Sequence, residues 1–332
     1  MKLTTVTAAF AALLLTAPFA EAKTKMVLSN DASALGVKGQ TFDKLKSEIE
    51  ARLGDEITVE VHHSGALFDQ KTQLQGLQLG SASLVAPTSG IYTPIAPGIG
   101  VMTLPFMLTS AEAVAEAWQD ETVRSAYFPE LEKKNIQPVA IWMNGPRELS
   151  YRGDKPILTP EDIKGVKIRV QSVPSDIEAF KIVGANPVSM SWGEVPSALQ
   201  QGVIDAIEPT PNAVAGGGMI DVVDQMTKFG YQYSYYMVSV NKMWWDGLPE
   251  DERGQLSDAI DATTQWNWEN AAKDNEDAYQ ALIDAGKQVH ELDDAQKAAW
   301  AEAMQPVWEE YGTGIAGEEV MNRLREIAGV SE

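Results

Sequence analysis

One arginine in an alternating stretch is the residue of this chain best placed to do chemistry. Residues 166–170 alternate between apolar and basic side chains, which predicts a short strand with Arg169 on its basic face. A guanidinium held on rigid strand backbone can grip a carboxylate through two parallel hydrogen bonds. We therefore expect Arg169 to bind an anionic ligand. The alternative is a structural arginine that pairs with an internal acid.

Residues suited to covalent or metal chemistry are scarce. The chain has no cysteine and three histidines, and two of these, His62 and His63, are neighbours in a predicted strand. Neighbouring strand residues point to opposite faces, so the two cannot hold one metal ion. Neither a Gly-x-Ser-x-Gly nucleophile elbow nor a Walker-type phosphate loop occurs. We predict a protein that is not an enzyme and that uses no metal and no cofactor.

The composition constrains the partners of the protein. The chain has 332 residues, of which 44% are hydrophobic and 22% are charged, enough for a sizeable core and two domains. Its formal net charge of −21 disfavours nucleic acid and anionic lipid as partners. A site for an anion in so acidic a protein must be made locally, by a few enclosed arginines.

The N-terminus has the features of a secretory signal. Lys2 precedes an apolar run at 8–15, and an A-x-A pattern at 20–22 predicts that the first 22 residues are removed. The apolar run is too short to span a membrane, and no later stretch has about 18 consecutive apolar residues. Because no cysteine is available for a lipid anchor, we expect a periplasmic protein that is not a lipoprotein. An uncleaved membrane anchor is the alternative.

Hydrophobic periodicity predicts alternating strands and helices, hence an α/β protein with mixed sheets flanked by helices. Residues 159–162 are expected to start a short helix with Thr159 as its N-cap. The expected strands lie near 26–28, 57–61, 83–86, 138–142, 148–151, 166–170, 187–190, 203–208, 226–240 and 289–292. The expected helices lie near 37–53, 71–79, 111–119, 122–134, 174–183, 193–201, 255–285, 294–311 and 317–328.

The helix predicted at 255–285 is long for a globular domain. Neither proline nor glycine interrupts it, and Gly286 is a natural end point. We expect it to lie across two lobes as a spine. A coiled-coil dimer is the alternative, but strict heptads are not sustained along this stretch. We therefore expect a monomer.

Several motifs occur in the order found in one transport family. The clearest are TPEDIKGVKIRV at 159–170, GANPV at 184–188 and EVPSALQQGVIDAIE at 194–208. Shorter matches are LPF at 104–106, GPR at 145–147, and a tryptophan followed by Leu-Pro at 245–249. Together they cover nearly the whole chain after the signal. The chain resembles the periplasmic solute-binding subunits of TRAP transporters, the DctP-type proteins.

This resemblance implies a fold, a function and partners. The fold is the two-lobed periplasmic binding protein fold, with one lobe at 23–145 plus about 234–275 and the other at 146–233 plus about 276–332. The implied function is capture of a small organic carboxylate, such as a C4-dicarboxylate or a sugar acid, and delivery to the membrane permease subunits of a TRAP transporter. Alternatives are an ABC-type binding protein and a periplasmic sensor or enzyme domain for the same ligands.

The resemblance also implies site residues in the second lobe. The family's KIRV arginine pairs with the substrate carboxylate, and it is Arg169 here. Arg147 matches an assisting arginine, with a surface arginine at a lobe crossing as the alternative. Trp192 matches an aromatic residue that packs on the ligand, although it could equally be a core residue.

Two further positions concern the end of the strand predicted at 203–208. Glu208 matches a family glutamate. The next position is usually an asparagine that contacts the ligand, but here it is Pro209, which has no side-chain donor and no N–H. Either Asn212 supplies the missing hydrogen bond, or this protein prefers a different substrate.

Candidates from the first lobe rest on location alone. Ligands of open α/β sheets bind at loops that follow the carboxyl ends of strands. The loops after the first three predicted strands contain Asn30, Gln70, Ser89 and Tyr92, which we predict to contribute to the site. Packing within the loops is the alternative role for each.

Overall fold

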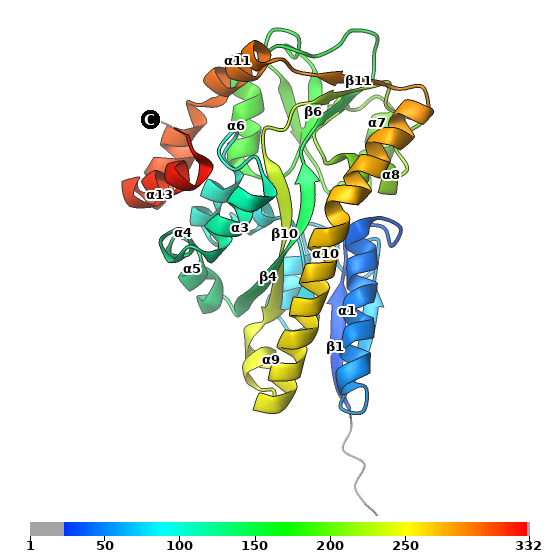
Figure 1. The fold of residues 1–332 in the computed structure, drawn as a ribbon, viewed down its shortest axis with the longest axis vertical. Helices are drawn as coiled ribbons and strands as arrows, with labels where there is room; N and C mark the ends of the chain where they lie inside the picture. Colours follow the sequence, from blue (N-terminus) through cyan, green and yellow to red (C-terminus); the bar gives the residue numbers. More distant parts are fainter. Residues whose placement is uncertain (1–22, 331–332) are drawn as a thin grey trace, which may run out of the picture.

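The computed structural model describes residues 23–330, so the predicted signal peptide lies outside the described residues. Two β-sheets are each flanked by helices, and one long helix runs beside both (Figure 1). The predicted α/β class with mixed sheets is confirmed. None of the helices in this part of the chain is long and apolar enough to cross a bilayer.

The first sheet has five strands in the order β2-β1-β3-β10-β4. The β1 strand is parallel to β2 and β3, whereas β10 is antiparallel to β3 and β4. Apolar side chains of β1 and β2 and of the helix that joins them share one buried core. The strands are β1 (Thr24–Ser29), β2 (Ile57–His62), β3 (Leu84–Val85), β4 (Ile136–Pro146) and β10 (Tyr233–Asn241).

The second sheet has six strands in the order β11-β9-β5-β8-β6-β7. The β6 strand lies between β7 and β8 and is parallel to both, while β5 is antiparallel to its two neighbours. This places Arg169 on an interior strand. The strands are β5 (Leu149–Tyr151), β6 (Lys167–Val170), β7 (Asn186–Ser189), β8 (Ala206–Ile207), β9 (Gln225–Lys228) and β11 (Gln288–Glu291).

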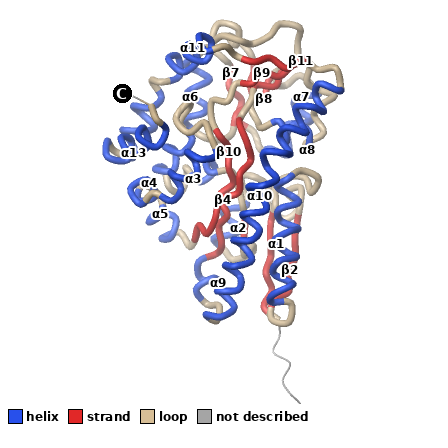
Figure 2. The backbone as a smooth tube through the Cα atoms, in the orientation of Figure 1, coloured by secondary structure: helices blue, strands red, loops and turns tan. Residues whose placement is uncertain are grey.

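Helices cover both sheets (Figure 2). The α-helices are α1 (Val37–Leu53), α2 (Gln73–Gln78), α3 (Ala111–Gln119), α4 (Glu121–Ser125), α5 (Phe128–Lys133), α6 (Pro174–Ile182), α7 (Val195–Gln200), α8 (Pro211–Gly216), α9 (Lys242–Asp246), α10 (Glu250–Asp284), α11 (Asp294–Met304), α12 (Gly314–Ala316) and α13 (Glu318–Ala328). Shorter turns are the 3₁₀ helices η1 (Ser89–Tyr92), η2 (Pro97–Thr103) and η3 (Trp192–Glu194) and the π-helix η4 (Glu309–Thr313).

The α10 helix is the long helix that the sequence predicts. It packs against α1 and β4 on the side of the first sheet and against α8 and β11 on the side of the second. It starts earlier than expected because Pro249 precedes three acidic residues, which favour the positive N-terminal end of a helix. Gly254 therefore lies inside the helix.

The chain passes between the two sheets at β4–β5, at β9–β10 and along α10. The prediction of one strand at 226–240 is wrong, because β9 and β10 belong to different sheets. Gly230 breaks the stretch with a φ of 60°. The side chain of Glu148 holds this connection, since its Oε2 accepts hydrogen bonds from the backbone N–H groups of Phe229 and Gly230. Its Oε1 accepts a hydrogen bond from the hydroxyl of Tyr279 on α10.

The predicted helix start at 159–162 is also wrong. The segment forms a turn in which the Asp162 carboxylate accepts hydrogen bonds from the N–H of Leu158, at 3.1 Å, and of Thr159, at 2.8 Å. The Asp162 carboxylate therefore stabilises a turn where Thr159 was expected to be the N-cap of a short helix. At the other end of the chain, α11 packs on α6 and α13 packs on α3 and α4. The predicted lobe boundaries put α13 in one lobe and α3 and α4 in the other, so these contacts run between the predicted lobes. The boundaries remain a prediction.

Two glycines allow a matched test of this backbone. Gly145, at the β4–β5 crossing, has a φ of 137°, and a Cβ there would collide with the Asn275 side chain. Gly145→Ala should lower the free energy of unfolding by about 2 kcal/mol. Gly254 lies within α10 with open space where a methyl group would project, so Gly254→Ala should raise that free energy by about 0.5–1 kcal/mol. Urea denaturation measures both, and changes of the same sign would contradict the prediction.

Candidate functional site

Arg169 is a buried cation for which residues 23–330 provide no acidic partner. Its side chain projects from β6 and the residue is 1% exposed. Nε and Nη2 donate hydrogen bonds to the carbonyl of Met190 at 3.2 and 2.9 Å, and Nη2 also donates to Gln70 Oε1 at 3.0 Å. Among the described residues, no carboxylate lies within ion-pair distance of this guanidinium. Burial is the largest influence on the pKa of Arg169 and lowers it to about 10.

Arg147 is buried as well, but its charge is compensated. It follows Pro146 at the end of β4, and its guanidinium pairs with the carboxylate of Glu208, which also accepts a hydrogen bond from Tyr231 at 2.9 Å. Burial is the largest single influence and lowers the pKa of Arg147, but Glu208, Tyr231 and Asp176 together outweigh it and hold the pKa above the ordinary value. At 4% exposure, Arg147 is not the surface arginine that the alternative interpretation required.

One cavity collects residues from both sheets. Arg169, Arg147, Trp192, Asn212 and Gln70 line it, which brings together five of the nine predicted site residues. The other lining residues are Asp31, Ala32, Ser33, Gly36, Val37, Lys38, Thr88, Asn144, Gln171, Pro209, Thr210, Ala213, Gly216, Gly217 and Tyr236.

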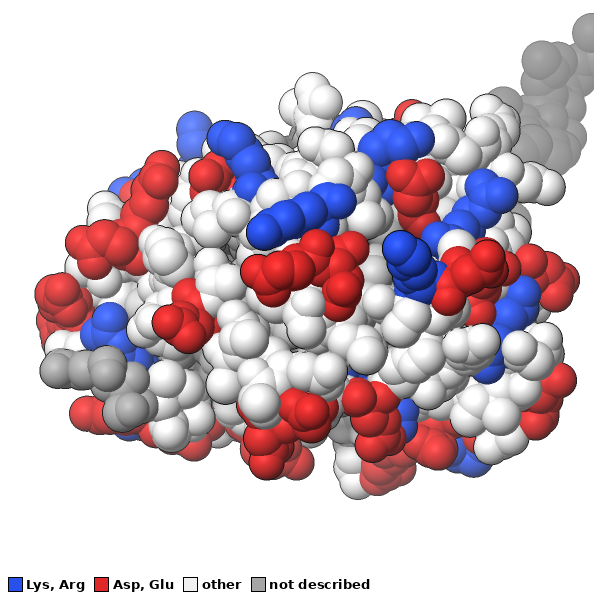
Figure 3. All heavy atoms as spheres, turned by 90° about the horizontal axis from the view of Figure 1, so that it is seen from above, with Lys and Arg blue, Asp and Glu red and all other residues white. Residues whose placement is uncertain are grey.

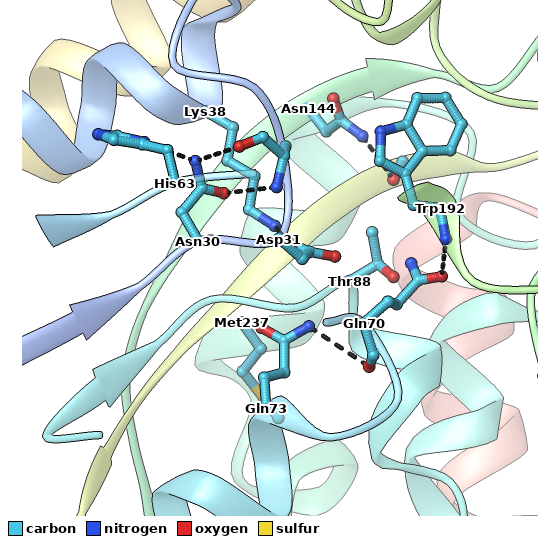
Figure 4. Close-up of polar contacts among 12 residues, drawn as sticks. Asn30, Asp31, Lys38, His63, Gln70, Gln73, Thr88, Asn144, Trp192 and Met237 are labelled. Carbon is cyan, nitrogen blue, oxygen red and sulfur yellow. Dashed lines mark hydrogen bonds and ion pairs between the residues drawn. The ribbon is translucent and has the colours of Figure 1, made fainter. Parts of the chain in front are cut away.

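Hydrogen bonds across the cavity join the two sheets. Gln70, from the loop after β2, accepts a hydrogen bond from Arg169. It also accepts one from the backbone N–H of Trp192 at 3.1 Å, which Figure 4 shows. Thr88, after β3, donates to the side chain of Gln171, just beyond β6, at 3.1 Å. The indole ring of Trp192 lies 5.6 Å from the Arg169 guanidinium, within reach of a cation–π contact. The arrangement is closed, with the guanidinium shielded from solvent.

Asn212 and Glu208 are more constrained than the sequence suggests. The amide of Asn212 donates to the carbonyl of Asn144 at 3.2 Å and accepts from the hydroxyl of Thr210. It lines the cavity near Pro209, but its hydrogen bonds are already used within the protein. Glu208 is fully buried and is not among the lining residues. Its carboxylate bonds to Arg147 and Tyr231, and its negative charge also raises the pKa of Arg169, against the larger opposing influence of burial.

Three predicted residues of the first lobe do not line the cavity. Asn30 bonds to the backbone of Ala32 and to His63, and so shapes the loop after β1 (Figure 4). The hydroxyl of Tyr92 donates to Met237 and Ser239 within the core. Ser89 is buried at the start of η1. Their loops were located correctly, but the directions of their side chains depend on packing that periodicity does not reveal.

Two charged residues of the cavity were missed. Asp31 directly follows Asn30, and Lys38 lies in the first turn of α1; both line the cavity and pair with each other. The Lys38 ammonium also lies 4.3 Å from the ring centroid of Tyr236. A signal was available, since Asp31 lies at the carboxyl end of β1, the edge where ligands of such sheets bind.

The described residues contain no group of three or more His, Asp or Glu side chains placed to hold a metal ion. Lysines and arginines on the face seen in Figure 3 are interspersed with acidic side chains and form no continuous basic patch. The cavity therefore provides a small anion with a buried cation, which this face does not.

Comparison with known proteins agrees with this geometry. Residues 28–313 match the family described as bacterial extracellular solute-binding protein, family 7. The C4-dicarboxylate-binding periplasmic protein DctP of Rhodobacter capsulatus is 33% identical over 285 residues, which cover 85% of each chain. The 2,3-diketo-L-gulonate-binding periplasmic protein YiaO of Escherichia coli K12 is 28% identical over 262 residues, covering 79% of this chain and 78% of that protein.

A solved structure shows the same likeness. The TRAP periplasmic solute-binding protein of Shewanella oneidensis, with bound succinate, has a TM-score of 0.88 and 27% sequence identity, covering 92% of this chain and 100% of that one. The two-lobed fold and the resemblance stated from the motifs are thereby confirmed. The chain belongs to the bacterial extracellular solute-binding protein family 7, the TRAP-type periplasmic proteins that bind substrates rather than convert them.

Proposed function

We propose that this protein captures a small organic acid in the cavity between its two lobes and delivers it to the membrane permease subunits of a TRAP transporter. The observation that carries the proposal is the buried Arg169, which has no acidic partner within the described chain. Burying a cation without a counterion is unfavourable, and a bound carboxylate removes that penalty. The named ligands of the relatives above, C4-dicarboxylates, diketogulonate and succinate, all carry a carboxylate.

The contacts of Arg169 define how a carboxylate would dock. Nε and Nη2 are engaged by Met190 and Gln70, so Nη1 is the nitrogen left for a ligand within the closed structure. A two-pronged contact through both Nη atoms requires Gln70 to release one bond. The low dielectric of the closed cavity strengthens the pairing, because water no longer screens the two charges. Arg147, held in place by Glu208, adds a second guanidinium to the same wall.

The lobe boundaries and the route of the ligand belong to this proposal. We place one lobe at 23–145 plus about 234–275 and the other at 146–233 plus about 276–332, with the connections at β4–β5 and β9–β10 as hinges. Opening would break the bonds that Gln70 and Thr88 make across the cavity.

Replacement of Arg169 tests the proposal directly. A thermal-shift screen with succinate, malate, galacturonate, galactonate and glucuronate identifies acids that raise the melting temperature. For an acid that does, Arg169→Ala should weaken binding by about 2–5 kcal/mol, or roughly 30- to 4,000-fold, as measured by calorimetry. Arg169→Lys should show most of that loss, because an ammonium cannot reproduce the planar fork.

The control for this loss is Arg152→Ala. Arg152 directly follows β5 of the same sheet and is exposed, and it donates to the carbonyl of Leu199, which does not line the cavity. Its replacement should leave affinity unchanged. Unchanged affinity in both Arg169 variants would remove Arg169 from the site.

A second experiment separates the two arginines by stability in the absence of ligand. Glu208→Gln leaves the buried Arg147 without its counterion, which should cost about 3–5 kcal/mol of unfolding free energy. Arg169→Gln removes a cation that has no acidic partner, so its lost hydrogen bonds are offset by a smaller burial penalty. We expect Arg169→Gln to change the unfolding free energy by no more than about 1 kcal/mol. Equal losses in urea denaturation would show that Arg169 is a structural residue like Arg147.

A further inference from the structure

A second ion pair lies within the cavity, on the side of the first sheet. The Lys38 ammonium binds Oδ1 of Asp31, and each of the two side chains is 6% exposed. Figure 4 shows the Asp31 carboxylate beside this ammonium, with Thr88 and Gln70 across the same space. Both charged residues line the cavity together with Arg169. Any ligand held by Arg169 therefore meets a lysine whose charge is already neutralised.

The charges enclosed around the cavity can be counted from their partners. Arg147 is balanced by Glu208, and Lys38 is balanced by Asp31, which leaves Arg169 as the cation without an acidic partner among the described residues. Two further buried acids lie near them: Glu148, whose carboxylate is engaged at the β9–β10 connection, and Asp176, which accepts a hydrogen bond from Gln232 at 2.9 Å. Asp274, whose carboxylate accepts a hydrogen bond from the N–H of Val37 in the cavity lining, is partly exposed and is not counted as enclosed. Burial raises the pKa of Asp176 to about 7, so it carries at most one negative charge at neutral pH. The enclosure thus holds a net charge between zero and +1.

This count favours one carboxylate over two. A single carboxylate brings the enclosure to between −1 and zero, whereas a dicarboxylate brings it to between −2 and −1. An uncompensated charge in a closed site is costly. A second carboxylate would also face Asp31, a like charge, while the neighbouring lysine remains occupied.

The groups on this side of the cavity suit hydroxyls. A hydroxyl can donate to the Asp31 carboxylate and accept from the Lys38 ammonium at the same time. Thr88, Gln171 and Asn144 add neutral donors and acceptors to the lining. An ammonium group on the ligand would instead be repelled by Lys38.

Resting on the carboxylate-binding function proposed above, we propose that the site selects hydroxylated acids with a single carboxylate, of the aldonic or uronic acid type. The carboxylate binds Arg169, and hydroxyl groups bind the Asp31–Lys38 pair. Asp31 is the specificity-determining residue, because it holds the lysine charge that would otherwise attract a second carboxylate. The site thereby discriminates against dicarboxylates of the same length.

Acids that differ only at one end provide the test. Galactonate and galactarate share a carbon skeleton and its secondary hydroxyl groups, but the terminal hydroxymethyl group of galactonate is a second carboxylate in galactarate. Gluconate and glucarate, and threonate and tartrate, differ in the same way. Calorimetry on the wild-type protein should show, for the pair that binds, at least tenfold tighter binding of the member with one carboxylate. Butyrate and succinate, which lack hydroxyls, should bind more weakly than that member.

A variant tests the role assigned to Asp31. Asp31→Asn keeps the shape of the side chain but leaves the Lys38 charge without its partner. The affinity for the dicarboxylate member of the pair should therefore rise at least tenfold. The preference for the member with one carboxylate should become smaller or reverse. Glu50→Gln is the control, since it removes one negative charge from an exposed position of α1. It should leave the preference unchanged.

The outcomes separate this proposal from the one on which it rests. Tighter wild-type binding of a dicarboxylate or of butyrate would overturn the selectivity and leave carboxylate capture standing. An unchanged preference in a folded Asp31→Asn variant would overturn the role of Asp31. Should Asp31→Asn fail to fold, the wild-type pairs still decide the selectivity. No binding of any acid in the panel would instead count against the proposed function.

Discussion

A buried positive charge that has no counterion within the described part of the chain is the constraint on which the rest of this structure depends. Arg169 is removed from water by both lobes and held by the carbonyl of Met190 and the amide of Gln70. These neutral acceptors orient the guanidinium but do not cancel its charge. Arg147, which lines the same cavity, has its own carboxylate in Glu208. In the function proposed above, this contrast is the reason that Arg169 is the cation expected to bind the ligand carboxylate, while the charge of Arg147 is already compensated by Glu208.

The scaffold keeps this charge in place while leaving the lobes joined by few segments. The interior position of β6, with parallel neighbours on both sides, fixes the backbone from which Arg169 projects. Glu148 ties the β5 strand to the β9–β10 connection and to α10 through backbone and tyrosine donors. Burial is the largest influence on the pKa of Glu148 and raises it to about 7. Buried polar contacts of Glu148 therefore hold the β9–β10 connection next to α10, the helix that packs on both sheets.

Much of the fold could be predicted because its local signals agree with its tertiary structure. The helix α1, the strand β2 and the long helix α10 all appear at or near their predicted positions, whereas the single helix predicted at 122–134 is divided into α4 and α5. The exceptions are instructive. The 226–240 stretch is continuous in pattern but divides between two sheets, since strand propensity cannot say which partner a strand will pair with. At 159–162 the Asp162 carboxylate supports a turn instead of the expected helix.

The candidate site also has parts that the sequence predicts and parts that only the tertiary structure determines. Residue types and motifs by themselves determined the family, the α/β class and the candidate arginines, because these depend on local pattern and on short segments whose order is preserved. Only the tertiary structure decided which charges are paired. Arg147 meets Glu208 across 61 positions of sequence, Lys38 meets Asp31 around one loop, and Gln70 reaches Arg169 across 99 positions. Such contacts depend on how two lobes enclose a common space, and no periodicity along the chain records which side chains that space brings within hydrogen-bonding distance.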